Sequence, residues 1–332
     1  MQRFGVIGGG AWGTALAQVL RRAGREVVLW AREAEAVAAI NQSHENPLFL
    51  PGVALDPGIA ATTKLDAVAL ADALLLTVPA QYLRDTCTAL APSLAAGRPV
   101  VICTKGIEEG SGALMSEVVA SSLPQAALAV LSGPTFAIEV ARGLPTAVTL
   151  AANDTGLGQS LIAAMGTRAF RPYLSDDVIG AQIGGAVKNV MAIACGIIMG
   201  RGMGDNARAA LITRGLAEMV RLALAKGGKS ETLMGLSGLG DLTLTCSSTQ
   251  SRNHALGLAL GKGEDLSRYL AARRSVAEGV SSASATATLA RRLNVDMPIV
   301  AAVDAILHRG AAIDQVVEEL LARPFKQEAP GA

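Results

Sequence analysis

The sequence predicts an α/β N-terminal domain with a doubly wound, mostly parallel sheet, followed by an all-α C-terminal domain. Strand-like apolar segments alternate with helical ones over the first half of the chain, as in sheets whose parallel strands are joined by helices. From about Ile179 to Leu321 the strand signals disappear and helical periodicity with glycine-rich breaks remains. We therefore expect one domain over residues 1–178 and a second over residues 179–332.

A glycine-rich turn joins the first predicted strand to the first predicted helix. The apolar run at residues 4–7 ends at Gly8, and an Ala- and Leu-rich helical pattern follows at once. Gly8, Gly10 and Gly13 complete the pattern G-x-G-x-x-G, which permits a tight turn, close approach of a pyrophosphate and close packing of helix on strand. The helix N-terminus offers N–H groups to phosphates. This context favours a dinucleotide-binding Rossmann domain over a plain strand-to-helix turn.

The second strand, expected over Glu26–Trp30, bears on the choice of dinucleotide. Sites that prefer NAD usually place Asp or Glu at the end of this strand to hold the ribose 2′-hydroxyl. Here Ala31 and Arg32 follow the strand, and a guanidinium suits a 2′-phosphate. Glu33 offers a carboxylate if the strand ends later. The sequence thus favours NADP(H) and leaves NAD(H) open.

Composition excludes several classes of protein. The chain has 332 residues, 51% of them hydrophobic, and can build two cores. Its net charge of +1 and dispersed charged residues argue against a surface for nucleic acid or anionic membranes. The first strand begins close to Met1, which leaves no space for a signal peptide, and the apolar stretch at residues 190–199 is too short to span a bilayer. We expect a cytoplasmic protein.

The cysteines and histidines argue against a metal site and against a Ser-His-Asp triad. The four cysteines show no CxxC spacing and are expected to be reduced and buried. The three histidines are scattered along the chain. Proton chemistry is therefore expected from Lys, Asp, Glu or Tyr. The cysteines are Cys87, Cys103, Cys195 and Cys246, and the histidines are His44, His254 and His308.

Polar residues follow two of the remaining strands of the first domain. Ligands of such sheets bind beyond the carboxyl ends of the strands. Lys105 follows one strand, where it is either a ligand-binding or a solvated loop residue, and Gly133 and Thr135 belong to a turn after another. The expected strands lie at residues 73–79, 99–104, 128–131, 146–150 and 169–174, with a helix at 81–90 and a polar surface loop at 41–57 near the cofactor cleft.

The strongest chemical signal lies in the helical segment at residues 184–198. This segment is apolar on all sides except at Lys188 and Asn189, which predicts a buried central helix. Lys188 either extends its ammonium to solvent or is held inside near a polar partner. Burial would lower its pKa toward the range that is useful for acid–base catalysis.

Two later loops carry further candidates. Asp241 ends a glycine-rich loop at residues 235–241, where it either caps a helix or orients Lys188. Ser251, Arg252 and Asn253 precede a helical run, which suits a phosphate at a helix N-terminus, with a Ser-rich N-cap loop as the alternative.

Together these segments resemble the bacterial-type NAD(P)-dependent glycerol-3-phosphate dehydrogenases over nearly the whole chain. The matching stretches are GGGAWGTALA near the start, TKG at 104–106, SGPTFA at 132–137, KN at 188–189, GLGD at 238–241, SRN at 251–253 and EG at 278–279. The resemblance implies reversible reduction of dihydroxyacetone phosphate to sn-glycerol 3-phosphate for phospholipid synthesis, and a homodimer.

The resemblance also implies roles for individual residues. Lys188 would exchange the proton with the carbonyl oxygen, and Lys105, Asn189 and Asp241 would shape the reacting site. The implied substrate contacts are Lys105, Gly133, Thr135, Lys188, Asp241, Ser251, Arg252 and Asn253. The implied cofactor contacts are Gly8, Gly10, Ala11, Trp12, Gly13, Arg32, Lys105, Ala137, Arg252, Val276 and Glu278. Ala11 departs from the Ser of many members and removes one hydroxyl near the pyrophosphate.

Two other functions remain open on the residues. A reductase of the same plan acting on a 2-keto or 3-hydroxy acid would use Arg for a carboxylate, although the Ser-Arg-Asn cluster with two lysines suits a phosphate better. A dinucleotide sensor without activity would have no reason to bury Lys188 beside Asn189.

Overall fold

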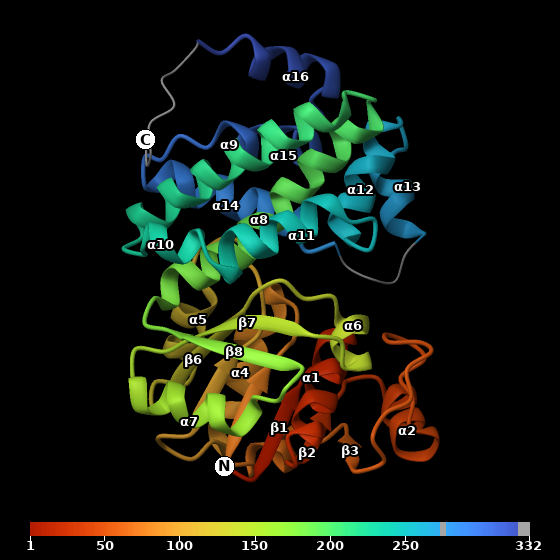
Figure 1. The fold of residues 1–332 in the computed structure, drawn as a ribbon, viewed down its shortest axis with the longest axis vertical. Coiled ribbons are helices and arrows are strands. Elements are labelled where there is room, and N and C mark those ends of the chain that lie inside the picture. The colour runs from red at the N-terminus through yellow and green to blue at the C-terminus, as the bar shows by residue number, and fades with distance from the viewer. Residues whose placement is uncertain (273–276, 325–332) are drawn as a thin grey trace. The chain divides into compact units, whose positions relative to one another are not determined.

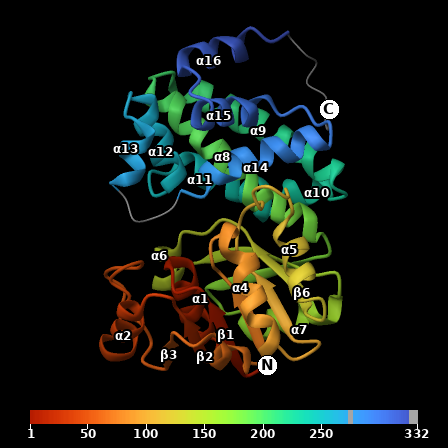
Figure 2. The same ribbon diagram turned by 180° about the vertical axis from the view of Figure 1, so that it is seen from behind.

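The computed structural model describes residues 1–272 and 277–324, which form two compact units (Figures 1 and 2). Unit 1 comprises residues 1–104 and 115–178, and unit 2 comprises residues 105–114 and the chain from Ile179 onward. Residues 105–114 therefore belong to the helical unit, whereas the sequence analysis had placed them in the first domain. This difference matters because Lys105 lies in that segment.

Unit 1 is built on one eight-stranded sheet with the strand order β3-β2-β1-β4-β5-β6-β7-β8. Neighbouring strands are parallel except for β6 and β7, which pair antiparallel. The sheet confirms the predicted doubly wound, mostly parallel architecture. The strands are β1 (Arg3–Ile7), β2 (Glu26–Trp30), β3 (Ile59–Thr62), β4 (Ala73–Leu76), β5 (Pro99–Ile102), β6 (Ala127–Ser132), β7 (Thr146–Ala151) and β8 (Phe170–Ser175).

Helices pack on both faces of this sheet. Helix α1 packs with α6 and α7, visible in front in Figure 1. Helix α4 packs with α3 and α5, and α4 and α5 lie in front in Figure 2. The helices of unit 1 are α1 (Ala11–Arg22), α2 (Ala34–Ser43), α3 (Leu65–Ala69), α4 (Leu83–Leu90), α5 (Met115–Ser122), α6 (Ala137–Arg142) and α7 (Thr155–Met165), with short 3₁₀ turns at Ala80–Tyr82 and Ala91–Ser93.

Strand β3 is an element that the sequence analysis missed. It has four residues of mostly small side chains and lacks the apolar alternation that marks a strand. Asn41, expected in a loop, lies in α2, and its side chain donates to the carbonyl of Ala61 (2.9 Å) and accepts from the Ala61 amide (2.8 Å). This side chain takes the place of a neighbouring strand and covers the edge of the sheet.

The core of unit 2 forms around α8 (Val178–Gly200). The helix is longer than the apolar stretch at 190–199 and, contrary to the sequence analysis, is long and apolar enough to cross a membrane by length and composition. However, 89% of its most apolar window is buried inside the protein. We therefore interpret α8 as the central helix of a packed helical domain.

Glycines let helix α12 (Arg252–Gly261) pack so closely on α8 that the two backbones are in contact. A Cβ atom on Gly257 would lie 2.1 Å from the carbonyl oxygen of Ile193, and one on Gly196 would lie 2.2 Å from that of His254. The other helices are α9 (Gly204–Ala225), α10 (Ser230–Leu233), α11 (Asp241–Ser247), α13 (Leu266–Ala271), α14 (Gly279–Arg292), α15 (Pro298–His308) and α16 (Ile313–Leu321), with a π-helical turn at Leu236–Gly240.

Candidate active site

The glycine turn of unit 1 has the backbone that a pyrophosphate needs. Gly8 has a φ of +124°, and a Cβ on Gly13 would lie 1.9 Å from the carbonyl oxygen of Gly8, so both positions require glycine. A Cβ on Gly10 would meet nothing within 4 Å, so open space lies in front of this residue. Gly10 is the N-cap of α1 and makes no side-chain cap. The first-turn amides of a long helix therefore face an open position, which fits a dinucleotide.

The loop after α2 lies against the same turn. Asn46 is fully buried, and its amide nitrogen donates to the carbonyl of Gly9 and to the hydroxyl of Thr14, both at 2.8 Å. The indole nitrogen of Trp12 is buried without a hydrogen-bond partner among the described residues. A buried N–H without a partner is costly, and it is consistent with a polar ligand at this turn.

Strand β2 ends at Trp30, as predicted, so Ala31 and Arg32 occupy the positions that follow it. The side chain of Arg32 is 76% exposed and pairs with Glu33, whose Oε1 lies 2.9 Å from Nη2. The guanidinium is thus accessible, and a neighbouring carboxylate competes for it.

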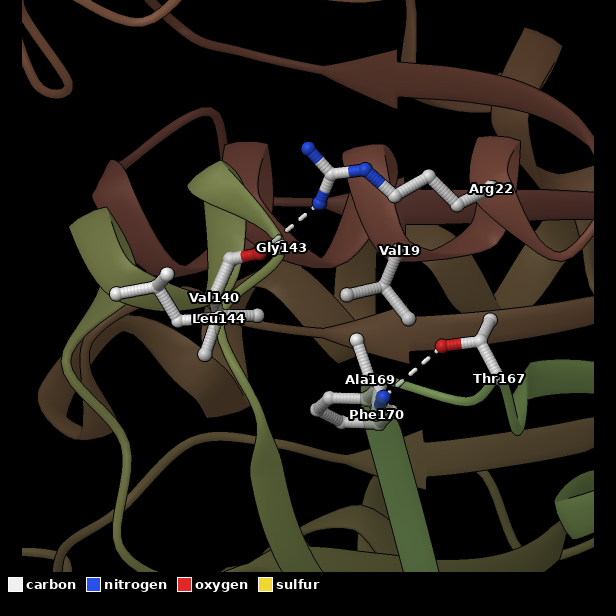
Figure 3. Close-up of a pocket in the computed structure, with 8 residues that line it drawn as sticks. All are labelled: Val19, Arg22, Val140, Gly143, Leu144, Thr167, Ala169 and Phe170. Carbon is white, nitrogen blue, oxygen red and sulfur yellow. Dashed lines mark hydrogen bonds between the residues drawn. The ribbon is translucent and has the colours of Figure 1, made fainter.

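The turn after β6 carries Gly133 and Thr135. Gly133 has a φ of +147°, and the hydroxyl of Thr135 donates to its carbonyl at 3.2 Å. Ala137 opens α6 directly afterwards. Figure 3 shows Arg22 of α1 extending to α6, where it donates to the carbonyl of Val140. Arg22 also donates to the carbonyl of Ala141. The small pocket in that figure lies toward the C-terminal end of α1, away from the glycine turn, and is a packing gap between α1, the end of α6 and residues 167–170 at the start of β8.

Two lysines of unit 2 share the carboxylate of Asp241. Lys105 Nζ lies 2.7 Å from Oδ2, and Lys188 Nζ lies 2.5 Å from Oδ1. Asp241 is fully buried and Lys188 is 6% exposed. Asp241 is the first residue of α11, and no side-chain cap is made at that helix start. The carboxylate therefore orients lysines rather than capping its helix.

Burial lowers the pKa of Lys188 from 10.5 to about 8. The charge of Asp241 opposes this shift, and the nearby ammonium of Lys105 reinforces it. Lys188 also donates to the hydroxyl of Thr245 at 2.9 Å, and that hydroxyl donates to the carbonyl of Asp241 at 2.6 Å. The result is a buried amine that is held by two acceptors and has a pKa well below that of a free lysine.

The predicted polar residues around α12 fall into three environments. Asn253 is buried and donates to Asn189 Oδ1 (3.0 Å), while its own Oδ1 accepts from the amide of Gly279 (3.0 Å). Ser251 is the N-cap of α12, and its hydroxyl accepts from the amide of His254 (3.2 Å). The hydroxyl oxygen of Ser251 therefore caps α12, which is the Ser-rich N-cap alternative that the sequence left open. Arg252 is exposed at the first turn of the helix.

Glu278 precedes α14 and belongs to the same charged group. Burial raises the pKa of its carboxyl, and the positive charges of Arg252, Lys105 and Lys188 oppose that shift. Val276, the remaining predicted cofactor contact, lies outside the described residues. In the described part of the chain, no cluster of three or more His, Cys, Asp or Glu side chains could hold a metal ion.

Comparison with known proteins identifies the family. Residues 3–157 match the model for the N-terminal part of NAD-dependent glycerol-3-phosphate dehydrogenase, and residues 177–318 match the model for its C-terminal part. The chain belongs to the NAD-dependent glycerol-3-phosphate dehydrogenase family. A glycerol-3-phosphate dehydrogenase [NAD(P)+] of Rhodospirillum rubrum is 60% identical over 329 residues, covering 99% of this chain and 94% of the relative.

Solved structures agree with the family. The crystal structure of glycerol-3-phosphate dehydrogenase from Coxiella burnetii has a TM-score of 0.93 at 42% identity and covers 97% of this chain and 99% of its own. A ketopantoate reductase from Ralstonia eutropha, with a TM-score of 0.59 at 17% identity over 96% of this chain and all of its own, shares the fold alone. The likeness therefore favours the dehydrogenase family over the alternative reductase.

Within this dehydrogenase, each unit gathers part of the predicted site. Unit 1 holds the glycine turn, Arg32 and the turn with Gly133 and Thr135; unit 2 holds the lysines with Asp241 and the start of α12. The sequence analysis missed Thr245. Its signal was its spacing, because the fourth residue after Asp241 lies on the same face of a helix.

Proposed function

We propose that the chain catalyses the reversible reduction of dihydroxyacetone phosphate to sn-glycerol 3-phosphate with NAD(P)H. Its family membership supports the reaction. The single observation that carries the chemistry is the buried Lys188, held on Asp241 with its pKa lowered to about 8. An amine of this kind can give a proton to a carbonyl oxygen and take it back in reverse.

Several residues of unit 2 would each have a separate role at the carbonyl oxygen. A bound nicotinamide cofactor would supply the hydride-transfer chemistry. Lys188 donates the proton to the oxygen as negative charge develops there, and Lys105 adds a fixed positive field. Asp241 and Thr245 hold the Lys188 amine in place. Asn189 is held by Asn253 and offers a further polar group to the hydroxyl site.

The phosphate of the substrate would bind at the start of α12. Arg252 is exposed there and supplies a fork of donors, while the first-turn amides add the positive end of the helix dipole. The Ser251 oxygen is engaged as the N-cap, so its role toward phosphate would be to donate its own hydroxyl proton. Gly133 and Thr135 complete the proposed set of substrate contacts.

The proposed cofactor preference is NADP(H). The exposed guanidinium of Arg32, after a strand that lacks a terminal carboxylate, supports recognition of a 2′-phosphate. Its pairing with Glu33 would weaken that recognition, so use of NAD(H) would remain. The other proposed cofactor contacts are Gly8, Gly10, Ala11, Trp12, Gly13, Lys105, Ala137, Arg252, Val276 and Glu278.

We also propose that the enzyme is a cytoplasmic homodimer that supplies glycerol phosphate for phospholipid synthesis. These statements rest on the family resemblance. Sedimentation of the purified chain would test the dimer.

The deciding experiment follows the oxidation of NADPH and NADH by dihydroxyacetone phosphate in a spectrophotometric assay. Ketopantoate serves as the alternative substrate for reduction with NADPH or NADH, and 3-hydroxyisobutyrate as the alternative substrate for oxidation with NADP+ or NAD+. The proposal predicts turnover of dihydroxyacetone phosphate alone. Faster turnover of either acid would assign the chain to another substrate, and binding of NADPH without turnover of any of these substrates would indicate a sensor.

A further inference from the structure

Lys105 reaches the buried carboxylate from a loop rather than from a helix. Residues 105–114 leave unit 1 after Thr104, join unit 2, and return at Met115. Gly106, with a φ of +155°, is the only residue between Lys105 and the first core anchor of this loop, Ile107. The position of the Lys105 ammonium therefore depends on how firmly the loop is fixed to unit 2.

The loop is closed and anchored at its base. Ile107 and Leu114 form an antiparallel bridge, and both side chains are buried in the core of unit 2. The amide of Glu108 donates to the carbonyl of Ala113 (3.0 Å), and the amide of Gly112 donates to the carbonyl of Glu108 (3.0 Å). We call residues 105–114 the Lys105 hairpin.

The tip of the Lys105 hairpin accepts hydrogen bonds from a side chain of α14. Arg292, the last residue of that helix, donates to the carbonyl of Ser111 and, from Nη2, to the carbonyl of Gly110 at 2.9 Å. A planar guanidinium fits two adjacent acceptors in a way that an ammonium does not. Arg291, its neighbour in the same helical turn, instead donates within α14 to the hydroxyl of Thr288 (3.1 Å).

We propose that Arg292 is a positioning residue for catalysis, which fixes the Lys105 hairpin and thereby holds the Lys105 ammonium on Asp241. This inference rests on the proposed function. Arg292 contacts the tip of the hairpin and acts on the reaction through Lys105. Its loss lets the hairpin move, so that Lys105 leaves its place beside Asp241 for part of the time.

Loss of Arg292 would change both the reaction rate and the pKa of Lys188. Misplacement of a charged group by about 1 Å can lower a rate by up to about 10²-fold. The titratable groups that interact electrostatically with Lys188 are Asp241 and Cys246 from α11, Glu278 before α14 and Lys105 from the hairpin. Arg252 interacts in turn with Glu278. Since Lys105 lowers the pKa of Lys188, its displacement raises that pKa.

The test compares Arg292→Gln with Arg291→Gln, which removes the same charge from the same helical turn. Arg292→Gln should lower kcat for dihydroxyacetone phosphate reduction by about 3- to 30-fold. The KM for the cofactor should stay the same, and the alkaline limb of the kcat profile should move to higher pH. Arg292→Lys should fall between the wild type and Arg292→Gln. Arg291→Gln should match the wild type.

Hydrogen–deuterium exchange of the segment 105–114 supplies a readout besides activity. Exchange should rise in Arg292→Gln and not in Arg291→Gln. Equal kcat and equal pH profiles in the two variants would overturn the proposal, and so would a lower kcat with an unmoved alkaline limb. Failure of the wild type itself to reduce dihydroxyacetone phosphate would instead reject the proposed function.

Discussion

Lys105 and Lys188 bind different oxygens of one buried carboxylate, that of Asp241, at 2.7 and 2.5 Å. One carboxylate thus offsets only part of the charge of two ammonium groups. Burial lowers the pKa of Lys188, and the ammonium of Lys105 lowers it further. This arrangement places a lysine with a lowered pKa beside the ammonium of a second lysine.

Thr245 should contribute through the hydrogen bond that its hydroxyl accepts from Lys188. Thr245→Val removes this acceptor while nearly preserving the volume of the side chain. Loss of one hydrogen bond to a charged group should lower kcat by about 10- to 10²-fold and leave the cofactor KM unchanged. Thr245→Ser keeps the hydroxyl and should recover most of the rate. A Thr245→Val enzyme with the kcat of the wild type would remove this residue from the site.

Arg252 should matter only for substrates that carry a phosphate. Loss of charge-assisted hydrogen bonds in Arg252→Ala should raise the KM for dihydroxyacetone phosphate by about 10- to 10²-fold. The poor use of unphosphorylated dihydroxyacetone should change little. Steady-state kinetics with both substrates make the comparison, and equal losses would assign Arg252 to the fold or the cofactor.

Arg32 and Glu33 should control cofactor choice in opposite directions. Arg32→Ala should raise the KM for NADPH by about tenfold and leave that for NADH nearly unchanged. Glu33→Gln removes the carboxylate that pairs with Arg32 at 2.9 Å, so it should lower the KM for NADPH. If both variants affect the two cofactors alike, the guanidinium does not bind the 2′-phosphate.

Gly257 should be needed for the close approach of α12 to α8. A Cβ there would lie 2.1 Å from the Ile193 carbonyl oxygen, so Gly257→Ala should lower the free energy of unfolding by about 1–3 kcal/mol. It should also raise the KM for dihydroxyacetone phosphate, because α12 carries Arg252. Urea unfolding measures the first effect. Gly235→Ala is the control, since its Cβ would meet nothing closer than 3.4 Å; equal stability of the two variants would contradict the packing argument.

Local sequence signals predicted much of the fold. The glycine turn and the strand Glu26–Trp30 could be predicted because each depends on neighbours in sequence. Strand β3 could not be predicted, because its small residues gain their conformation from pairing with β2. The assignment of residues 105–114 to unit 2 depends on the core contacts of Ile107 and Leu114 with the distant helical domain.

The candidate site was likewise predictable from the sequence only in part. The sequence singled out Lys105, Lys188 and Asp241 one at a time, yet their convergence joins positions up to 136 residues apart. Only the fold distinguishes an Asp241 that orients lysines from one that caps a helix. For Ser251 the fold gives the opposite result, since its oxygen caps α12.

The central claim is that Lys188 exchanges the proton, and the pH dependence of kcat in Lys188→Met tests it most directly. In the wild type the amine is protonated below its lowered pKa, so kcat for reduction should fall as the pH rises through about 8, and kcat for oxidation should rise. Folded Lys188→Met should bind NADPH, lose about 10²- to 10⁴-fold in kcat and lose this pH dependence. Lys188→Arg should restore little, since a guanidinium holds its proton. A folded Lys188→Met enzyme with near-normal turnover and an unchanged pH profile would contradict the account.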